Sequence, residues 1–125
     1  MTLSMQAPAH RLERLRSWMD AEDVDCSVVL GPDHVNHLCG YWRYFGGASA
    51  LVITRDGERT LVVMRDEVPI AAATAQAEDV IGYGERGFGI NLDPEADLVA
   101  AVAKHPAVAG ARPAQRWPKP ATAAA

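Results

Sequence analysis

Apolar residues recur at helical spacing near the start of the chain. Leu12, Leu15 and Trp18 follow one another at spacings of three residues, and Met19 lies four residues after Leu15, so all four share one face of a helix. This spacing predicts a helix over residues 9–22 whose apolar face lies on a core.

A continuous apolar run follows at Cys26–Leu30, which is the pattern of a strand buried on both faces. Gly31 and Pro32 close this run. Residues 33–39 then predict a short helix, and Gly40 is placed to end that helix in a left-handed conformation.

Two further apolar runs, 48–54 and 59–64, flank the dipeptide Asp56-Gly57. Asp-Gly between apolar runs is a strong hairpin signal, so we expect two antiparallel strands here. The remaining predicted elements are a helix over 66–77, a strand over 79–83, a helix that starts with Asp93 as N-cap and ends near residue 105, and an edge strand over 108–112.

This order of helices and strands predicts an α/β domain with helices on both faces of a sheet. A chain of 125 residues, 49% of them hydrophobic, is long enough for one core and too short for two. We expect a flexible start over 1–8, one domain over 9–112 and a disordered tail over 113–125. The tail contains three prolines and no repeated apolar stripe.

The charge and the apolar content narrow the classes of function. A formal net charge of −4 argues against a nucleic-acid partner, which needs a basic face. The first ten residues lack the apolar run of a signal peptide, and no stretch approaches the ~20 apolar residues of a membrane span. We therefore expect a cytoplasmic protein without a membrane partner. Cys26 and Cys39 are expected to be free thiols.

Two candidate catalytic or metal sites lie in residues 33–39. His34 and His37 are three apart on one helical turn, yet no third ligand follows at a suitable spacing, so polar helix-end residues are the preferred interpretation. Cys39 and His37 are two apart and point to different sides of a helix, which argues against a nucleophile and its base. The residues thus indicate no catalytic group and no metal ligand.

The stretch from Gly82 to Gly87 matches the dinucleotide fingerprint G-x-G-x-x-G and follows a predicted strand. The fingerprint requires a helix that opens within the motif, whereas the next helix here is predicted from Pro94. A small-molecule or nucleotide-binding domain that uses this loop is the alternative function.

The stretch from Gly31 to Tyr41 resembles the P-x-N-V-x-Y-L-T-G-F/Y pattern of creatinase/prolidase amino-terminal domains, and the resemblance extends from about residue 11 to 112. His34, His37 and Cys39 stand where Asn, Tyr and Thr are usual in that pattern. The resemblance implies a three-layer α/β/α fold with a ribonuclease-H-like motif. Its mixed sheet would have five strands in the order 3-2-1-4-5, with strand 2 antiparallel.

The same resemblance implies a non-catalytic accessory domain of an Xaa-Pro dipeptidase, an Xaa-Pro aminopeptidase or a creatinase-like metallohydrolase. In that family, two divalent metals such as Mn, Co or Zn, or none in the creatinase branch, belong to a separate pita-bread domain whose motifs this chain lacks. This chain alone is then expected to be inactive and to carry no cofactor. Its expected partners are a second copy of itself or a catalytic metallohydrolase domain.

Five contact-prone residues remain, namely Tyr41, Trp42, Arg43, Tyr44 and Phe45. Two interpretations of this aromatic segment stay open. The segment covers the end of the sheet, or, as the resemblance implies, it reaches across a dimer and lines the substrate pocket of the partner subunit. Gly47 replaces an arginine that binds the substrate carboxylate in the creatinase branch, which argues against creatinase activity in a parent protein.

Overall fold

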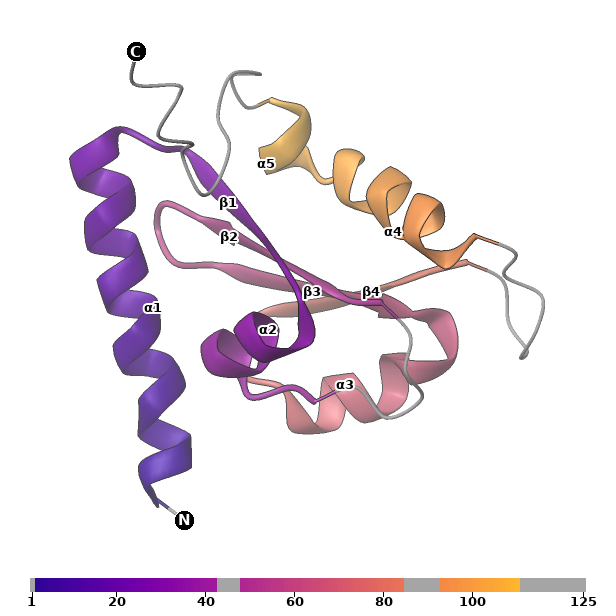
Figure 1. Cartoon of the computed structure of the whole chain (residues 1–125), viewed down its shortest axis with the longest axis horizontal. Helices are drawn as coiled ribbons and strands as arrows, with labels where there is room; N and C mark the ends of the chain where they lie inside the picture. Colours follow the sequence, from indigo (N-terminus) through magenta and orange to yellow (C-terminus); the bar gives the residue numbers. More distant parts are fainter. Residues whose placement is uncertain (1, 43–47, 85–92, 111–125) are drawn as a thin grey trace.

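Four strands form one mixed sheet at the centre of the structure, a computed structural model (Figure 1). It describes residues 2–42, 48–84 and 93–110, with side chains from Pro8 onward. The elements in chain order are α1 (Thr2–Glu22), β1 (Cys26–Leu30), α2 (Pro32–Cys39), β2 (Ala50–Thr54), β3 (Arg59–Met64), the 3₁₀ turn η1 (Arg65–Glu67), α3 (Val68–Thr74), β4 (Asp79–Tyr83), α4 (Pro94–Ala103) and α5 (Pro106–Ala109).

The sheet order is β1-β2-β3-β4. β2 runs antiparallel to both of its neighbours, and β4 pairs parallel with β3, so β2 alone of these four strands runs against the others. The carboxyl ends of β1, β3 and β4 therefore lie at one end of the sheet, beside the start of β2. The segments that enter β2 and leave β3 and β4 meet at this end.

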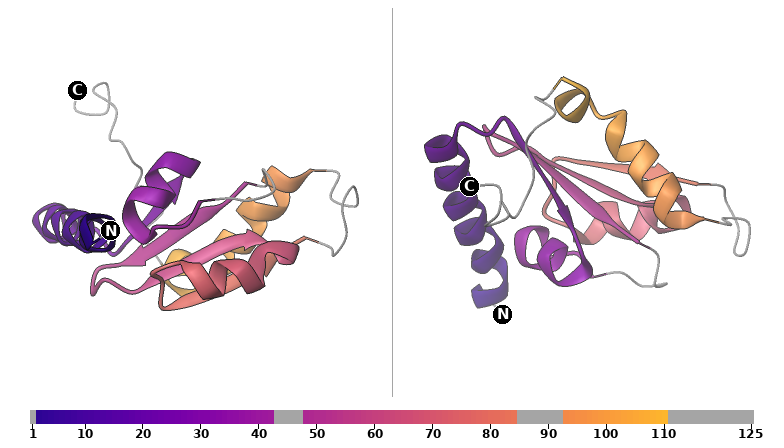
Figure 2. Two further views of the ribbon diagram at one scale, coloured as in Figure 1. Left: turned by 90° about the horizontal axis from the view of Figure 1, so that it is seen from below. Right: turned by 45° about the horizontal axis from the view of Figure 1, so that its top comes forward.

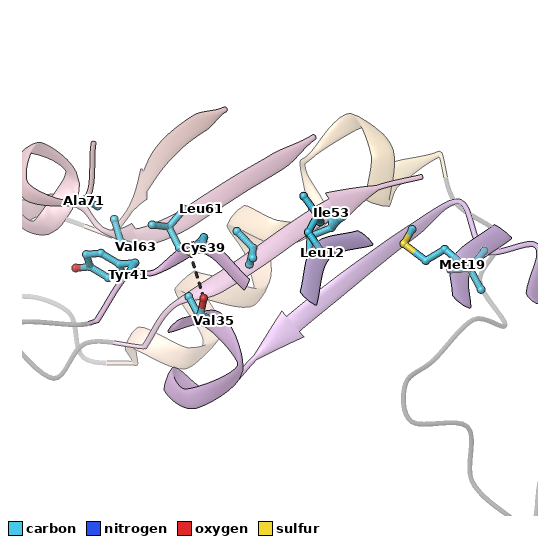
Figure 3. Close-up of a cluster of buried hydrophobic side chains, with 11 residues drawn as sticks. Leu12, Met19, Val35, Cys39, Tyr41, Ile53, Leu61, Val63 and Ala71 are labelled. Atoms are coloured by element: carbon cyan, nitrogen blue, oxygen red, sulfur yellow. Dashed lines mark hydrogen bonds between the residues drawn. The ribbon is translucent and has the colours of Figure 1, made fainter. Parts of the chain in front are cut away.

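Alternating side chains of the two central strands enter two separate cores. Leu51, Ile53, Leu61 and Val63 belong to a cluster completed by α1, α2 and α3 (Figure 3). The intervening residues of both strands pack with α4 on the other face, in a second cluster of Ala50, Val52, Val62, Tyr83, Leu98 and Val102. This confirms three layers, with α4 and α5 on the face opposite α2 and α3 (Figure 1).

Residues 55–57 turn the chain between β2 and β3, as Asp56-Gly57 predicts. The amide of Thr54 donates to the carbonyl of Glu58 at 3.0 Å, and the amide of Gly57 donates to the carbonyl of Thr54 at 2.9 Å. Gly57 has a φ of 93°, a conformation that glycine adopts at no steric cost. The first two helices, α1 and α2, pack against each other (Figure 2).

The strand order corrects the expectation that strand 4 lies beside strand 1. The connection from β3 to β4 contains η1 and α3, and it returns the chain to the side of the strand that it left, which is the usual arrangement for consecutive strands. β4 therefore takes the free edge of β3. The expected ribonuclease-H-like layout depended on the other order, and these four strands do not confirm it.

Three further expectations change. The described residues form four strands and not five, because residues 106–109 form α5 where an edge strand was expected over 108–112, of which residues 111–112 lie outside the described residues. β1 is an edge strand whose residues are only partly buried, since just one neighbour covers its backbone. Finally, α1 begins at Thr2, seven residues before the start that the apolar spacing predicts, and Pro8 lies inside it. The predicted tail over 113–125 lies outside the described residues.

Two valines on helices allow a matched test of this core. Val35 is 0% exposed in the cluster under α2, whereas Val99 is 61% exposed on α4. We expect Val35→Ala to lower the free energy of unfolding by about 2 kcal/mol, because it removes two buried methyl groups. Val99→Ala should change it by less than about 0.5 kcal/mol. Urea unfolding measures both, and equal effects of the two substitutions would contradict the placement of α2.

Candidate functional site

The aromatic segment begins with a residue of the core. Tyr41 is 1% exposed, and its ring lies beside Val63 of β3 and Ala71 of α3 (Figure 3). Its hydroxyl donates a hydrogen bond to Oε1 of Glu67 in η1. Tyr41 thus fixes the start of the segment against the turn that leaves β3.

Glu67 is a buried carboxylate with incomplete hydrogen bonding. Glu67 is 1% exposed, and its Oε2 has no hydrogen-bond partner among the residues that the structure describes. None of the ion pairs within this part of the chain includes Glu67. Burial of a charged group costs free energy unless hydrogen bonds or a counter-charge compensate. The hydrogen bond from Tyr41 is therefore important for the stability of the fold around Glu67.

A second tyrosine fixes the other end of the segment. Tyr83, the last residue of β4, donates from its hydroxyl to the carbonyl of Ala48 at 2.6 Å. Burial and the negative charges of Glu67 and Asp97 raise the pKa of Tyr83 to about 12. The hydroxyl therefore stays a protonated donor at neutral pH.

One carboxylate connects both ends, because Glu67 accepts from Tyr41 and its charge acts on Tyr83. We call Tyr41, Glu67, Tyr83 and the carbonyl of Ala48 the tyrosine clamp. The clamp holds residue 41 and residue 48, and so it fixes where the segment between them leaves and rejoins the domain.

Trp42 follows the clamp and is 51% exposed, in contrast to its neighbour Tyr41. A large aromatic side chain in solvent beside a fully buried one is available to another molecule. The other predicted residues of the segment, Arg43, Tyr44 and Phe45, lie outside the described residues. Whether the segment lines a pocket therefore stays a prediction.

The polar residues of α2 do not gather into a site. His34 and His37 are both exposed, and the carbonyl of His37 accepts a hydrogen bond from Arg11 at 3.3 Å. Cys39 is buried and donates to the carbonyl of Val35 at 3.2 Å, and burial raises the pKa of its thiol. Within the described ranges, no group of three or more His, Cys, Asp or Glu residues is placed to hold a metal ion.

Gly82 of the G-x-G-x-x-G motif has a packing role. A Cβ atom at this position would lie 3.0 Å from Cα of Arg65 and 3.0 Å from Cγ2 of Val68. Glycine therefore lets η1 approach β4, which is the approach that places Glu67 near Tyr83. The next helix after the motif in the described chain is α4 from Pro94, with Asp93 as its N-cap. Residues 85–87 of the motif lie outside the described residues.

Sequence reasoning did not identify Glu67 or Tyr83 as parts of this site. Asp66 and Glu67 were interpretable as the acidic start of a helix, and Tyr83 as the end of a strand. Both contacts join residues far apart in sequence, 26 and 35 positions respectively. The one available signal was Gly82, a glycine inside a strand, which indicates a close backbone approach.

The comparisons with known proteins assign the family. Residues 11–113 match the Creatinase/Prolidase N-terminal domain, and this chain belongs to that family. No curated protein sequence gives a significant match. In the described part of the chain, no helix is long and apolar enough to cross a membrane.

Three solved structures illustrate the likeness. A proline dipeptidase from Streptococcus pneumoniae is 28% identical with a TM-score of 0.51, over 57% of this chain and 53% of that chain. The creatinase/prolidase N-terminal domain of an X-Pro dipeptidase from Streptococcus pyogenes is 20% identical with a TM-score of 0.55, over 77% and 69%. A prolidase from Pyrococcus furiosus is 23% identical with a TM-score of 0.52, over 59% and 22%. The last two show the fold alone.

This chain spans only part of such relatives. It covers 53% of the pneumococcal dipeptidase chain and 22% of the archaeal prolidase chain. The match to an N-terminal domain solved by itself, that of the Streptococcus pyogenes dipeptidase, extends over 69% of that domain.

The bond between Tyr41 and Glu67 can be tested by a double-mutant cycle. Tyr41→Phe should lower the free energy of unfolding by about 1–3 kcal/mol, because it leaves the buried carboxylate without its donor. In a Glu67→Gln background the same change should cost less, because a neutral amide is less costly to bury. Urea unfolding of the four proteins gives the coupling, and equal costs in both backgrounds would refute this role of the bond.

The raised pKa of Tyr83 makes stability fall at high pH. An unfolded tyrosine ionises near pH 10, whereas Tyr83 in the folded chain ionises near 12. The stabilisation is complete below about pH 10 and is lost as the pH rises from about 10 to 12. Tyr83→Phe should remove this loss, and Glu67→Gln should shift the absorbance titration of Tyr83 to lower pH. If Glu67→Gln left the titration of Tyr83 unchanged, the charge of Glu67 would not act on Tyr83, and Glu67 would not belong to the clamp.

Proposed function

We propose that this domain is the non-catalytic amino-terminal part of an Xaa-Pro dipeptidase, an Xaa-Pro aminopeptidase or a creatinase-like metallohydrolase. Its role is to associate with another subunit and to present the aromatic segment to that subunit's substrate pocket. The observation that carries the proposal is the pair Tyr41 and Trp42, one locked in the core and the other in solvent. The family match over residues 11–113 supplies the context.

The physical argument is that a binding surface gains from being held in place before its partner arrives. Ordering side chains and loops on association costs free energy, and a segment fixed at both ends incurs less of that cost. The tyrosine clamp fixes residues 41 and 48 through two hydrogen bonds. Tryptophan, tyrosine and arginine are also the residue types enriched where protein interfaces gain most of their affinity.

The proposal assigns the chemistry to another part of the enzyme. Divalent metals and the residues that bind them belong to a catalytic domain, which acts on an Xaa-Pro peptide or a creatine-like substrate. The residues of this domain contribute shape and contacts. Cys39, the buried thiol of α2, has a pKa that burial raises, so it is unsuited to a nucleophile's role.

Self-association provides the first test. We expect the chain to form dimers in sedimentation equilibrium and Trp42→Ala to weaken the dimer by about tenfold or more, the change typical of a central interface residue. Val99→Ala removes an exposed apolar side chain from α4, far from the clamp in sequence, and should leave the dimer unchanged. A monomer at all concentrations, or equal effects of the two substitutions, would overturn the proposed interface.

Enzyme assay provides an independent test of the non-catalytic role. The purified chain, incubated with Xaa-Pro dipeptides and Mn²⁺ or Co²⁺, should release no proline above the protein-free control. Hydrolysis that co-purifies with the chain and is removed by chelation would contradict the proposal.

A further inference from the structure

His105 connects α4, α5 and β3, on the face of the sheet opposite Tyr41. It follows α4 and is the N-cap of α5, where its Nδ1 accepts a hydrogen bond from the amide of Ala107 at 3.1 Å. Its Nε2 lies 3.0 Å from Oγ1 of Thr60 on β3. Both ring nitrogens are thus engaged, one with the helix and one with the sheet.

These partners define the protonation state of the ring. An amide N–H is only a donor, so Nδ1 must carry a lone pair and no proton. The ring is then neutral, with its one proton on Nε2, from which it donates to Thr60. A second proton can be added only at Nδ1, which is the atom that caps α5. Protonation therefore removes the acceptor and turns one N–H toward another.

Little else attaches α5 to the domain. This four-residue helix has no buried residue, whereas α4 buries Leu98 and Val102. In the described part of the chain, α5 also contacts α4, Val108 is partly buried against the second core cluster, and the carbonyl of Ala107 accepts from the thiol of Cys26 at 3.6 Å. A single helical turn is not stable by itself, so its position depends on these few contacts.

We propose that His105 is a pH-sensitive clasp that docks α5 on β1 and β3 when its imidazole is neutral and releases α5 when the imidazole gains a proton. Imidazoles change charge between about pH 8 and 5, so docking is complete on the alkaline side of this range and is lost as the pH falls. Release uncovers Cys26 at the start of β1, where α5 now contacts its thiol.

Charged side chains on the neighbouring strands have other partners and do not replace the hydrogen bond between Ala107 and His105 when the imidazole gains a proton. On β3, Arg59 pairs with Glu78 at 3.2 Å. On β4, Asp79 is the partner of Thr60 and accepts from the amide of Val80 at 3.0 Å.

The neighbours on α4 and β1 complete this environment. Lys104 precedes His105 in the chain, and its side chain is exposed. Burial and the charge of Asp25 raise the pKa of the Cys26 thiol, which therefore stays a neutral donor over the range in which imidazoles titrate. His105 is then the group whose change of state breaks the cap.

Thiol labelling tests the clasp, because the chain contains its own reference. Cys26 is half-buried under α5, and Cys39 is buried in the core. The rate of Cys26 labelling by 4,4′-dithiodipyridine, divided by the rate in the urea-unfolded chain at the same pH, measures uncovering alone. We expect this ratio to rise about five- to tenfold from pH 8 to pH 5.5, the change expected for loss of one helix-capping bond. Cys39 should stay protected throughout.

His105→Asn is the matched control, because its side-chain oxygen caps a helix at every pH. The ratio should stay low and flat in this variant, and it should be high at both pH values in His105→Ala. Should His105→Ala fail to fold, the comparison of the native chain with His105→Asn still decides. A flat ratio in the native chain, or the same pH profile in His105→Asn, would overturn the proposal.

Discussion

The hydrogen bond from Tyr41 to Glu67 is the contact on which the position of the aromatic segment depends. A carboxylate that is 1% exposed, with one oxygen lacking a partner in the described chain, is tolerated only if its remaining bond is kept. That requirement fixes η1 relative to the residue that follows α2. Burial and the negative charge of Glu67 also raise the pKa of Tyr83, whose hydroxyl donates to the carbonyl of Ala48. Two distant points of the chain, residues 41 and 48, are thus each fixed by a tyrosine hydroxyl.

The proposed function assigns the tyrosine clamp the role of holding the aromatic segment at one end of the sheet. The carboxyl ends of parallel strands are the usual place for ligand contacts in α/β folds. Here Glu67 lies in η1, the turn directly after β3, and Tyr83 is the last residue of β4. Both side chains make hydrogen bonds to the residues that flank the aromatic segment. Trp42 extends from that support into solvent. Under the proposed function, this exposed side chain is part of the surface that the domain presents to another subunit.

Local patterns in the sequence predicted most of the elements. The alternation in β2 and β3, the glycine at position 57 and the cap at Asp93 act over a few residues, and the structure has each of them where expected. The neighbour of β4 could not be obtained in this way, because it depends on a pairing between strands that η1 and α3 separate in the sequence. The order 3-2-1-4-5 that the resemblance implied differs from the order of these four strands.

The candidate site was predicted only in part, for a similar reason. The run of aromatic residues marked the segment, and the helical spacing separated His37 from Cys39. The run did not reveal that Tyr41 is buried while Trp42 is exposed, because that difference arises from Glu67, 26 positions away. The residues 108–109 were apolar enough for a strand, yet the cap at His105 and Pro106 turned them into α5. In both cases, the burial of Tyr41 and the formation of α5, the outcome depends on the partners of particular side chains.

Photo-crosslinking from position 42 tests the central claim most directly. With p-benzoylphenylalanine in place of Trp42, irradiation should give a covalent dimer whose crosslink joins two copies, and Tyr41→Phe should reduce its yield. The same probe in place of Val99 should leave the chain monomeric. An absence of intermolecular product from position 42, or equal yields from both positions, would contradict a surface held in place by the tyrosine clamp.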